Sequence, residues 1–283
     1  MKLLIIGATG LLGNFLYKSL NSSFFITGSS RKNKKYLQLD LNNAKNTTDF
    51  FKKNKFDVII NTSGLVDVDK CNNNLNLAKK FNFQTVRNLV NSLKKLKINP
   101  HIIHFSTDQV YNNQKTHLNT ETKINLSNNY SKSKYLGELF LKKYKKKTII
   151  RTNFFGEIAG SKKKSFSNFI ITKLLNKQKL RIPNNIYFSP IHISFIPIAL
   201  KKIINNKIFG TYNLGSSDSN SKFNFVKEIA EIKKLKKKLI IPFNSNYKIN
   251  KRPYGTGMNI NKIENDLRIK LPTLKKSIQM LLK

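Results

Sequence analysis

The sequence is poor in several residue types, and each scarcity excludes a class of protein. Among 283 residues there is one cysteine, Cys71, no tryptophan, and only 14 acidic residues against 53 lysines and arginines. A single cysteine excludes an internal disulfide and fits the reducing cytoplasm, where we expect the protein to be located. No apolar run approaches the roughly 20 residues of a membrane-spanning helix, and no His, Cys, Asp or Glu cluster has metal-ligand spacing. We therefore expect neither a membrane segment nor a metal site.

The scarcity of acidic residues leaves a formal net charge of +39, which raises the question of a nucleic-acid partner. The positive charge is scattered in short groups, and only six of the 53 basic residues are arginine, the preferred reader of phosphate and guanine. Asn, Ile and Phe are abundant and Ala is scarce, as A/T-rich codons would produce. We expect no specific nucleic-acid partner, and non-specific polyanion binding stays an alternative.

A glycine-rich turn follows the first apolar run of the chain. Residues 2–6 read Lys-Leu-Leu-Ile-Ile, and Gly7-Ala8-Thr9-Gly10-Leu11-Leu12-Gly13 comes directly after them. A strand, a tight glycine turn and a helix over 10–20 would direct free N–H groups and the positive helix end at a diphosphate. A signal peptide is excluded, because the glycines interrupt the apolar run and no small-residue cleavage site follows. The turn predicts a dinucleotide site.

The residues after the second predicted strand indicate which dinucleotide binds. Strand Phe24–Thr27 is followed by Gly28, Ser29, Ser30, Arg31 and Lys32, where an NAD site usually offers an acidic residue. A guanidinium suits a 2′-phosphate, so the sequence favours NADPH and leaves NADH as the alternative.

Apolar runs alternate with helical patterns in the first half of the chain, and this rhythm breaks after about residue 153. Alternation predicts an α/β fold, a Rossmann-type doubly wound parallel sheet, with a smaller irregular α/β substrate lobe toward the C-terminus. We divide the chain into a dinucleotide-binding domain, 1–153, and a substrate-binding lobe, 154–283, and expect the two to form one intertwined unit without a sharp boundary. The expected strands are Leu3–Ile6, Phe24–Thr27, Tyr36–Leu39, Val58–Ile60, His101–Ser106, Thr148–Arg151, Thr211–Leu214 and Leu239–Ile241. The expected helices are 10–20, 46–54, 75–97, 129–145, 165–176, 194–205 and 222–235.

A hydroxyl-rich strand end and a tyrosine-lysine pair predict the chemistry. The strand at 101–106 leads into Ser106, Thr107 and Asp108, and the carboxyl ends of parallel strands form the ligand crevice. On the helix 129–145, Tyr130 and Lys134 share a face one turn apart. An ammonium beside a phenol lowers the pKa of the phenol and suits it to proton transfer, while a hydroxyl can polarise a carbonyl. His101 and His104 are interpreted as strand residues.

These motifs resemble the extended short-chain dehydrogenase/reductase superfamily, and more closely the dTDP-4-dehydrorhamnose reductase family, over nearly the whole chain. The stretches that carry the resemblance are 7–13, Leu39-Asp40-Leu41, Asn61-Thr62-Ser63-Gly64, Val68-Asp69-Lys70, 106–111, 130–134 with Gly137-Glu138, Arg151-Thr152-Asn153, Arg252-Pro253 and Leu271-Pro272.

The resemblance implies a role for each of these segments. Asp40 and Leu41 would lie near the adenine, and the cofactor cleft would be lined by Thr62, Ser63 and Gly64. Catalysis would fall to Thr107, Tyr130 and Lys134. The substrate would contact Ser106, Asp108, Asn153 and Arg252, the last through the diphosphate.

The implied reaction is reduction of a 4-keto group on a nucleotide-linked deoxysugar by NADPH, with Tyr130 as the proton donor. It would belong to dTDP-rhamnose and polysaccharide biosynthesis, and a homodimer is a further expectation. Two stretches depart from the family, Asn153-Phe-Phe-Gly156 and Phe188-Ser-Pro-Ile-His192, and both would lie near the sugar. The sugar and the nucleotide base therefore stay open.

Two further functions remain as alternatives. A sugar-nucleotide epimerase or dehydratase shares the fingerprint and the Tyr-x-x-x-Lys pair, but it retains NAD, and Arg31 and the short C-terminal lobe oppose it. A non-enzymatic subunit that binds NADP and regulates a partner would not need the intact Thr107, Tyr130 and Lys134.

Overall fold

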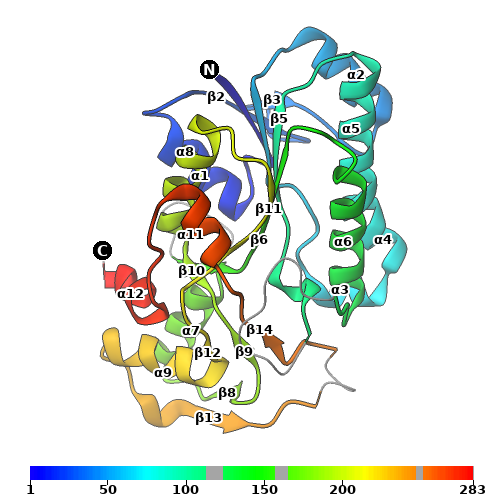
Figure 1. Ribbon diagram of the computed structural model, residues 1–283. Helices are drawn as coiled ribbons and strands as arrows, with labels where there is room; N and C mark the ends of the chain where they lie inside the picture. Colours follow the sequence, from blue (N-terminus) through cyan, green and yellow to red (C-terminus); the bar gives the residue numbers. More distant parts are fainter. Residues whose placement is uncertain (113–123, 157–164, 247–250, 283) are drawn as a thin grey trace. The chain divides into compact units, whose positions relative to one another are not determined.

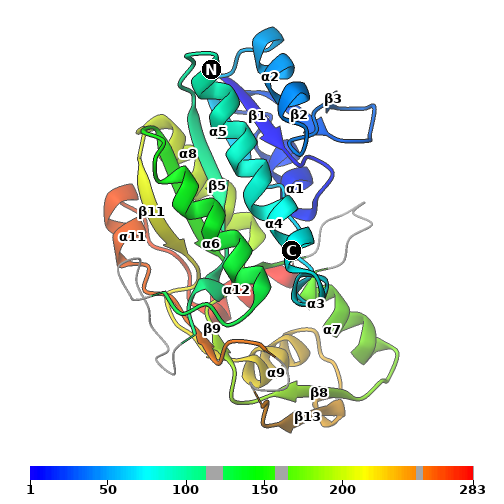
Figure 2. The ribbon, with the colours of Figure 1, turned by 90° about the vertical axis from the view of Figure 1, so that its right-hand side faces the viewer.

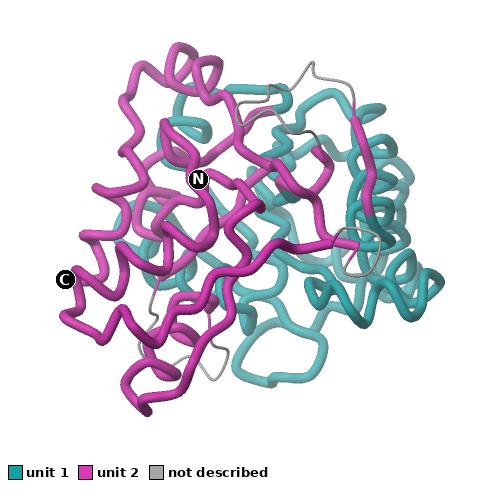
Figure 3. The backbone as a smooth tube through the Cα atoms, turned by 90° about the horizontal axis from the view of Figure 1, so that it is seen from below, with its two compact units in different colours: residues 1–107, 128–150, 200–211 teal, residues 108–127, 151–199, 212–283 magenta. Residues whose placement is uncertain are grey.

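The computed structural model describes residues 1–112, 124–156, 165–246 and 251–282. The chain forms two compact units, each assembled from three separate segments (Figure 3). Unit 1 comprises residues 1–107, 128–150 and 200–211, and unit 2 comprises residues 108–127, 151–199 and 212–283. The chain first passes from one unit to the other after Thr107. A functional boundary after residue 153 stays a prediction.

A seven-stranded sheet in the order β11-β6-β5-β4-β1-β2-β3 forms the centre of unit 1. The five strand pairs from β3 to β6 are parallel. β1 lies between β2 and β4, so the order of the strands reverses beside it, as in the predicted doubly wound fold, which the structure confirms. The strands are β1 Lys2–Ile6, β2 Phe25–Ser30, β3 Leu37–Gln38, β4 Val58–Asn61, β5 His101–Phe105, β6 Lys147–Thr152 and β11 Gly210–Leu214.

Helices cover both faces of this sheet. Figures 1 and 2 show α5 and α6 side by side along one face, with α2 next to α5, and Figure 1 shows α1 and α8 along the other. The first face is closed by one apolar cluster that includes Leu4 and Ile59 of the sheet and Leu89 of α5, all fully buried. The helices are α1 Leu11–Leu20, α2 Ala44–Lys53, α3 Val68–Asn73, α4 Leu75–Lys79, α5 Thr85–Lys95, α6 Asn129–Leu141 and α8 Ile196–Asn205, the last of which spans both units.

One predicted helix of unit 1 is interrupted. The pattern over 75–97 predicts a continuous helix, but α4 and α5 are joined by a π-helical segment, Lys80–Gln84. In this segment Asn82 is 1% exposed, and its side chain turns inward to bond with other elements. The predicted strand Tyr36–Leu39 shortens to Leu37–Gln38, and α3 was not predicted.

Unit 2 has short strands and helices around its own core. A three-stranded sheet has the order β12-β9-β14, and two strand pairs, β10 with β7 and β13 with β8, lie beside the helices. The fully buried Phe225 is the centre of the core and meets the rings of Phe155 and Phe188 edge to face. The elements are β7 Phe154–Phe155, α7 Phe166–Leu175, β8 Leu180–Pro183, β9 Tyr187–Phe188, β10 Ile191–His192, β12 Asn220–Ser221, α9 Lys222–Ile232, β13 Ile240–Phe243, β14 Gly255–Thr256, α11 Asn261–Leu267, α12 Leu274–Gln279 and the short 3-10 turns Asp108–Val110, Ile193–Phe195, Lys237–Leu239 and Met280–Leu282.

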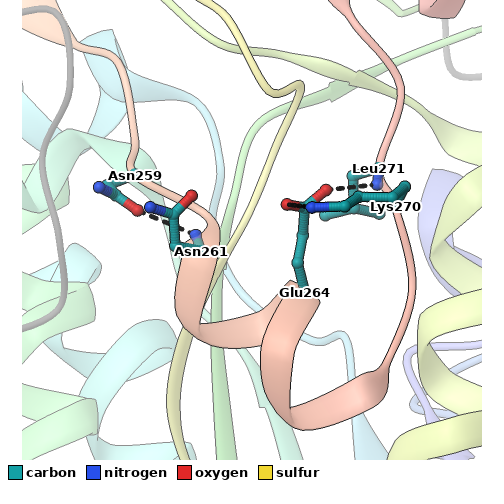
Figure 4. Close-up of polar contacts among 5 residues, drawn as sticks. All are labelled: Asn259, Asn261, Glu264, Lys270 and Leu271. Carbon is teal, nitrogen blue, oxygen red and sulfur yellow. Dashed lines mark hydrogen bonds and ion pairs between the residues drawn. The ribbon is translucent and has the colours of Figure 1, made fainter.

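A buried carboxylate organises the chain around α11, which the sequence did not predict. The backbone N–H of Leu271 and the ammonium of Lys270 both donate to Glu264, at 2.7 and 3.4 Å (Figure 4). At the start of the helix the side chain of Asn259 accepts from the N–H of Asn261. Glu264 thus fixes the turn that leads from α11 to the last helix.

Across the described ranges no helix is both long enough and apolar enough to cross a bilayer.

Candidate active site

The turn between β1 and α1 has the geometry of a phosphate cradle. Gly7 has φ +87°, a left-handed conformation that favours glycine, and a Cβ on Gly13 would overlap the carbonyl oxygen of Gly7. Gly10 begins α1 without a capping side chain, so the first N–H groups of the helix, from Leu11 and Leu12 onward, are open to an anion. The exposed Thr9 completes the turn. These features fit the diphosphate of a dinucleotide.

The end of β2 offers one buried hydroxyl beside this cradle. Ser29 is fully buried, and within the described structure its Oγ has no hydrogen-bond partner, so its predicted contact with a cofactor stays a prediction. Ser30 instead accepts from the N–H groups of Lys32 and Asn33 and shapes the loop. The guanidinium of Arg31 lies 4.9 Å above the ring of Phe81. Arg31 is exposed, and its contact with a 2′-phosphate stays a prediction.

The loops after β3 and β4 supply the other predicted cofactor residues. The carboxylate of Asp40 accepts from the N–H of Asn42 at 3.0 Å, and Leu41 is buried in the sheet core. Thr62 donates from its hydroxyl to the carbonyl oxygen of Ile6 at 2.7 Å, which ties the end of β4 to the end of β1. Both loops leave the carboxyl edge of the sheet, where the glycine turn also lies.

Ser63 and Gly64 continue the loop after β4. Ser63 donates to the side chain of Asn61, and Gly64 packs so closely that an added Cβ would lie 2.8 Å from Oδ1 of Asn82 and 3.7 Å from Nζ of Lys134. The loop backbone therefore approaches the predicted catalytic lysine directly.

Tyr130 and Lys134 lie in the first two turns of α6, as the sequence predicts. Asn128 begins the helix with a capping box: its side chain accepts from the N–H of Ser131, whose hydroxyl accepts from the N–H of Asn128. Tyr130 is 7% exposed and packs against Cys71 and its neighbours, and Lys134 is 4% exposed. The capped start of α6 thus fixes the position of the Tyr130 side chain.

The ammonium of Lys134 is held at the end of β5. Its Nζ donates to the carbonyl oxygen of Phe105 at 2.6 Å. Burial lowers the pKa of Lys134 to about 8, and the nearby carboxylate of Glu138 opposes this shift. A lysine in this setting is protonated at neutral pH and can donate to a sugar hydroxyl or stabilise a phenolate.

Ser106 and Thr107 follow β5 at the same edge of the sheet. The hydroxyl of Ser106 donates a hydrogen bond to the carboxylate of the fully buried Glu138, so its side chain is directed at α6. Thr107 is 3% exposed and is the last residue of this segment of unit 1. The structure thus gathers the predicted cofactor residues and the Thr107, Tyr130 and Lys134 group along one edge of one unit.

The remaining predicted substrate residues lie in unit 2. Asp108 is 3% exposed and accepts from Nδ2 of Asn153 at 2.9 Å and from the hydroxyl of Thr256 at 2.8 Å. Arg252 and Asp108 both act electrostatically on Lys222, so Asp108, Asn153 and Arg252 belong to one neighbourhood. Their role with a substrate stays a prediction.

The two strand histidines are structural and neutral. Burial lowers the pKa of His101 to about 4 and that of His104 well below its usual range. His101 bonds to Thr148 and His104 to Asn61. Among the described residues no three His, Cys, Asp or Glu side chains come together as metal ligands.

Comparison with known proteins places this geometry in a family. The model of the family described as "RmlD substrate binding domain" matches residues 1–283. The chain belongs to this family.

Two curated relatives and one solved structure show how far the likeness to the RmlD family extends. The chain is 26% identical to the spore coat polysaccharide biosynthesis protein SpsK of Bacillus subtilis, over 81% of this chain and 78% of that protein. It is 21% identical to the dTDP-4-dehydrorhamnose reductase of Escherichia coli, over 100% of this chain and 97% of that enzyme. The dTDP-4-dehydrorhamnose reductase of Bacillus anthracis in complex with NADP superposes with a TM-score of 0.89, at 21% identity, over 99% and 98% of the two chains.

Sequence reasoning missed two residues of this RmlD-family chain that lie beside predicted ones. Asn82 accepts from the N–H of Leu65 and donates to the hydroxyl of Ser133, so it joins the loop after β4 to α6. Lys222, in unit 2, shares its electrostatic surroundings with Asp108 and Arg252. An asparagine in the buried stripe of a helix could have signalled the first, whereas one lysine in a lysine-rich chain gives no signal.

Proposed function

We propose that the protein is an NADPH-dependent reductase that acts on the 4-keto group of a nucleotide-linked 6-deoxysugar such as dTDP-4-dehydrorhamnose. The protein is a sugar-nucleotide reductase, an NAD(P)-dependent oxidoreductase of the RmlD family. The specific reaction that we propose is supported above all by the buried Lys134, which is bonded to the end of β5 and lies one helical turn from Tyr130.

The residues of unit 1 would divide the work of holding the cofactor. Gly7, Gly10, Gly13 and the open start of α1 bind its diphosphate, and Arg31, which follows β2, receives the 2′-phosphate that distinguishes NADPH from NADH. Lys134 donates to the nicotinamide ribose. NADPH, when bound, supplies the hydride that reduces the carbonyl carbon.

Proton transfer would fall to Tyr130. Tyr130 gives its phenolic proton to the sugar oxygen as charge develops there, and the ammonium of Lys134 stabilises the phenolate that remains. Thr107 donates a hydrogen bond to the same oxygen and orients it. This division of roles needs no metal.

We also propose that the protein is located in the cytoplasm, that it forms a homodimer, and that its product is used in polysaccharide biosynthesis. Cell fractionation tests the first, and light scattering on the purified protein tests the second. Activity in the membrane fraction would contradict the cytoplasmic location. A monomer at the concentration used in the assay would contradict the homodimer.

The deciding experiment is an absorbance assay of cofactor oxidation. We expect the protein to oxidise NADPH in the presence of dTDP-4-dehydrorhamnose, with a lower rate for NADH. Other nucleotide-linked 4-keto sugars are assayed in parallel to identify the sugar and the base. No oxidation with any of them, by a protein that binds NADPH, would refute the proposed reaction. Tightly bound NAD in the purified protein would favour an epimerase or dehydratase instead.

A further inference from the structure

Glu138 is a buried acidic residue to which the proposed reaction assigns no step. It lies on α6 one turn after Lys134, and its carboxylate accepts from the hydroxyl of Ser106 at 2.5 Å. Taking a carboxylate out of water is unfavourable unless hydrogen bonds and a nearby cation compensate for the lost hydration. A glutamate that is 0% exposed beside the predicted catalytic residues therefore needs a reason.

Two consecutive residues at the end of β5 are bonded to two consecutive turns of α6. The carbonyl oxygen of Phe105 accepts from Nζ of Lys134 at 2.6 Å, and the next residue, Ser106, donates to Glu138. A single bond would let the strand end pivot against the helix, whereas two bonds one helical turn apart fix its register. The residue that follows is Thr107, so this pair of bonds sets where its backbone lies.

The helix α6 is itself held in place independently of the strand. A Cβ added to Gly137 would lie 2.7 Å from the carbonyl oxygen of Asn82, so α6 packs directly on the backbone of the π-helical segment. The side-chain amide of Asn82 also donates to the hydroxyl of Ser133 at 3.0 Å. Glu138 therefore holds the end of β5 from a helix that is anchored elsewhere.

The carboxylate of Glu138 also acts on the charge of Lys134. Burial lowers the pKa of Lys134, and Glu138 opposes this shift. The other titratable groups around this lysine are Tyr130 on α6, Cys71 on α3 and His104 in β5. Burial raises the pKa of Cys71 to about 11 and lowers that of His104 well below its usual range, so both are uncharged near pH 8. Glu138 thus supplies a negative charge that favours the ammonium form.

We infer that Glu138 is a positioning residue of the proposed reductase. Through Ser106 it holds the backbone of Thr107 in register with α6, and its charge keeps Lys134 in the ammonium form that donates to the cofactor ribose. The inference rests on the proposed function and deepens it by one residue. It also changes the role expected of Ser106, whose hydroxyl serves the link to α6 and not the contact with the sugar.

Glu138→Gln separates the charge from the hydrogen bond, because its amide oxygen can still accept from Ser106. The Kd of NADPH is measured by fluorescence titration over a range of pH. In the wild type we expect binding to weaken around pH 8, as Lys134 loses its proton. In Glu138→Gln this midpoint should move down by roughly 1 pH unit, because the ammonium has lost an opposite charge nearby. Below both midpoints the two proteins should bind NADPH alike.

Glu138→Asp keeps the charge and shortens the side chain. Its carboxylate no longer reaches Ser106, so kcat should fall roughly 10- to 100-fold with the KM of the sugar unchanged, as expected when a reacting group is misplaced. Its pH midpoint for NADPH binding should stay close to that of the wild type. Ser106→Ala breaks the same bond from the other end and should show the same loss of kcat, again with an unchanged KM.

Two controls isolate these effects. Asp49→Asn removes one negative charge from an exposed position on α2, and it should change neither the pH midpoint nor kcat. In a Lys134→Met background, Glu138→Gln should shift no midpoint, because the group that titrates is absent. A purely structural role for Glu138 would lower the stability of its variants to urea and move no pH midpoint, which would contradict the inference.

Two further results would overturn it. In one, Glu138→Gln and the wild type lose affinity for NADPH over the same pH range. In the other, Glu138→Asp keeps the wild-type kcat, or Ser106→Ala raises KM at an unchanged kcat. The binding titrations need no sugar, so they separate this inference from the proposed reaction. If the midpoint shifts as expected but the wild type reduces no 4-keto sugar, the role of Glu138 toward Lys134 stands and the proposed reductase falls.

Discussion

Each unit of the molecule contains a lysine whose pKa is lowered by burial, and the two lysines were found in different ways. Lys134 of unit 1 stands in a helix one turn after Tyr130, and the two residues are visible together in the sequence. Lys222 of unit 2 gains its surroundings from segments far apart, since Asp108 and Thr256 are separated by 148 positions. Lys134 can be predicted from a contiguous motif. Lys222 can be recognised only from the folded structure.

The proposed proton transfer belongs to unit 1. Variants in both units test how the two differ.

The largest effect is expected from Tyr130→Phe. Removal of the phenolic proton should lower kcat by about 10²- to 10⁴-fold, the usual range for loss of a general acid. The Kd of NADPH, measured by fluorescence titration, should stay unchanged. Tyr135→Phe on the same helix is the control and should retain wild-type turnover. A Tyr130→Phe enzyme with the wild-type rate would show that Tyr130 is not the general acid.

The second effect concerns the stability of unit 2. Glu264→Ala leaves the backbone N–H of Leu271 without its acceptor, and the free energy of unfolding should fall by about 1–3 kcal/mol. Lys270→Ala removes only a side chain that is 89% exposed, and it should cost at most about 0.5 kcal/mol. Urea denaturation compares the two variants. Equal losses would mean that the ion pair, and not the bond to the backbone, stabilises the turn.

The third effect is a pH dependence in unit 1. The folded pKa of Lys134, about 8, lies below the value of about 10.4 for an unfolded lysine, so the unfolded chain binds more protons between these pH values. The contribution of Lys134 to stability should therefore rise as pH increases through this window. Its ammonium is lost over the same range, and NADPH should bind more weakly above pH 8.

The comparison between wild type and Lys134→Met isolates this group. The difference in their urea midpoints should change in favour of the wild type above pH 8, and the pH dependence of NADPH binding should disappear in the variant. A constant difference across that range would show that Lys134 does not titrate there.

The smallest effect is expected from glycine substitutions just after two helices, one in each unit, and both should change the free energy of unfolding by a similar amount. Lys97 after α5 and Lys234 after α9 have left-handed backbones, with φ of 53° and 54°, where glycine is usual. Lys97→Gly and Lys234→Gly relieve this strain at some cost in chain entropy, and each should raise the free energy of unfolding by at most about 1 kcal/mol. Lys94→Gly, inside α5, should lower it by about 1 kcal/mol. Thermal melts distinguish the two signs.

The parallel sheet and the tyrosine-lysine pair could be predicted from the sequence because residues close together in the chain specify them. Strand β1, its glycine turn and helix α1 are specified by neighbouring residues, and so are the spacing and the cap of Tyr130 on α6. Glu138 could not be foreseen as the acceptor for Ser106, because that bond joins residues 32 positions apart.

Unit 2 shows where sequence reasoning ends. Helices α7, α8 and α9 were predicted from apolar periodicity, but α11 was not, because its turn depends on Glu264 meeting a backbone N–H beyond the helix. The neighbourhood of Lys222 is likewise a product of tertiary structure. A chain with 53 basic residues gives no local reason to choose one of them.

The π-helical segment at Lys80–Gln84 has a consequence for how this chain can change. A π-turn is equivalent to one extra residue inserted into an α-helix. Because the wide turn absorbs the extra residue, removing one residue from the segment would leave a regular helix with the buried faces of α4 and α5 still in phase. The cost would fall on Asn82, which joins the loop after β4 to α6 from within this turn. A one-residue deletion here should therefore preserve the helix and lose that connection.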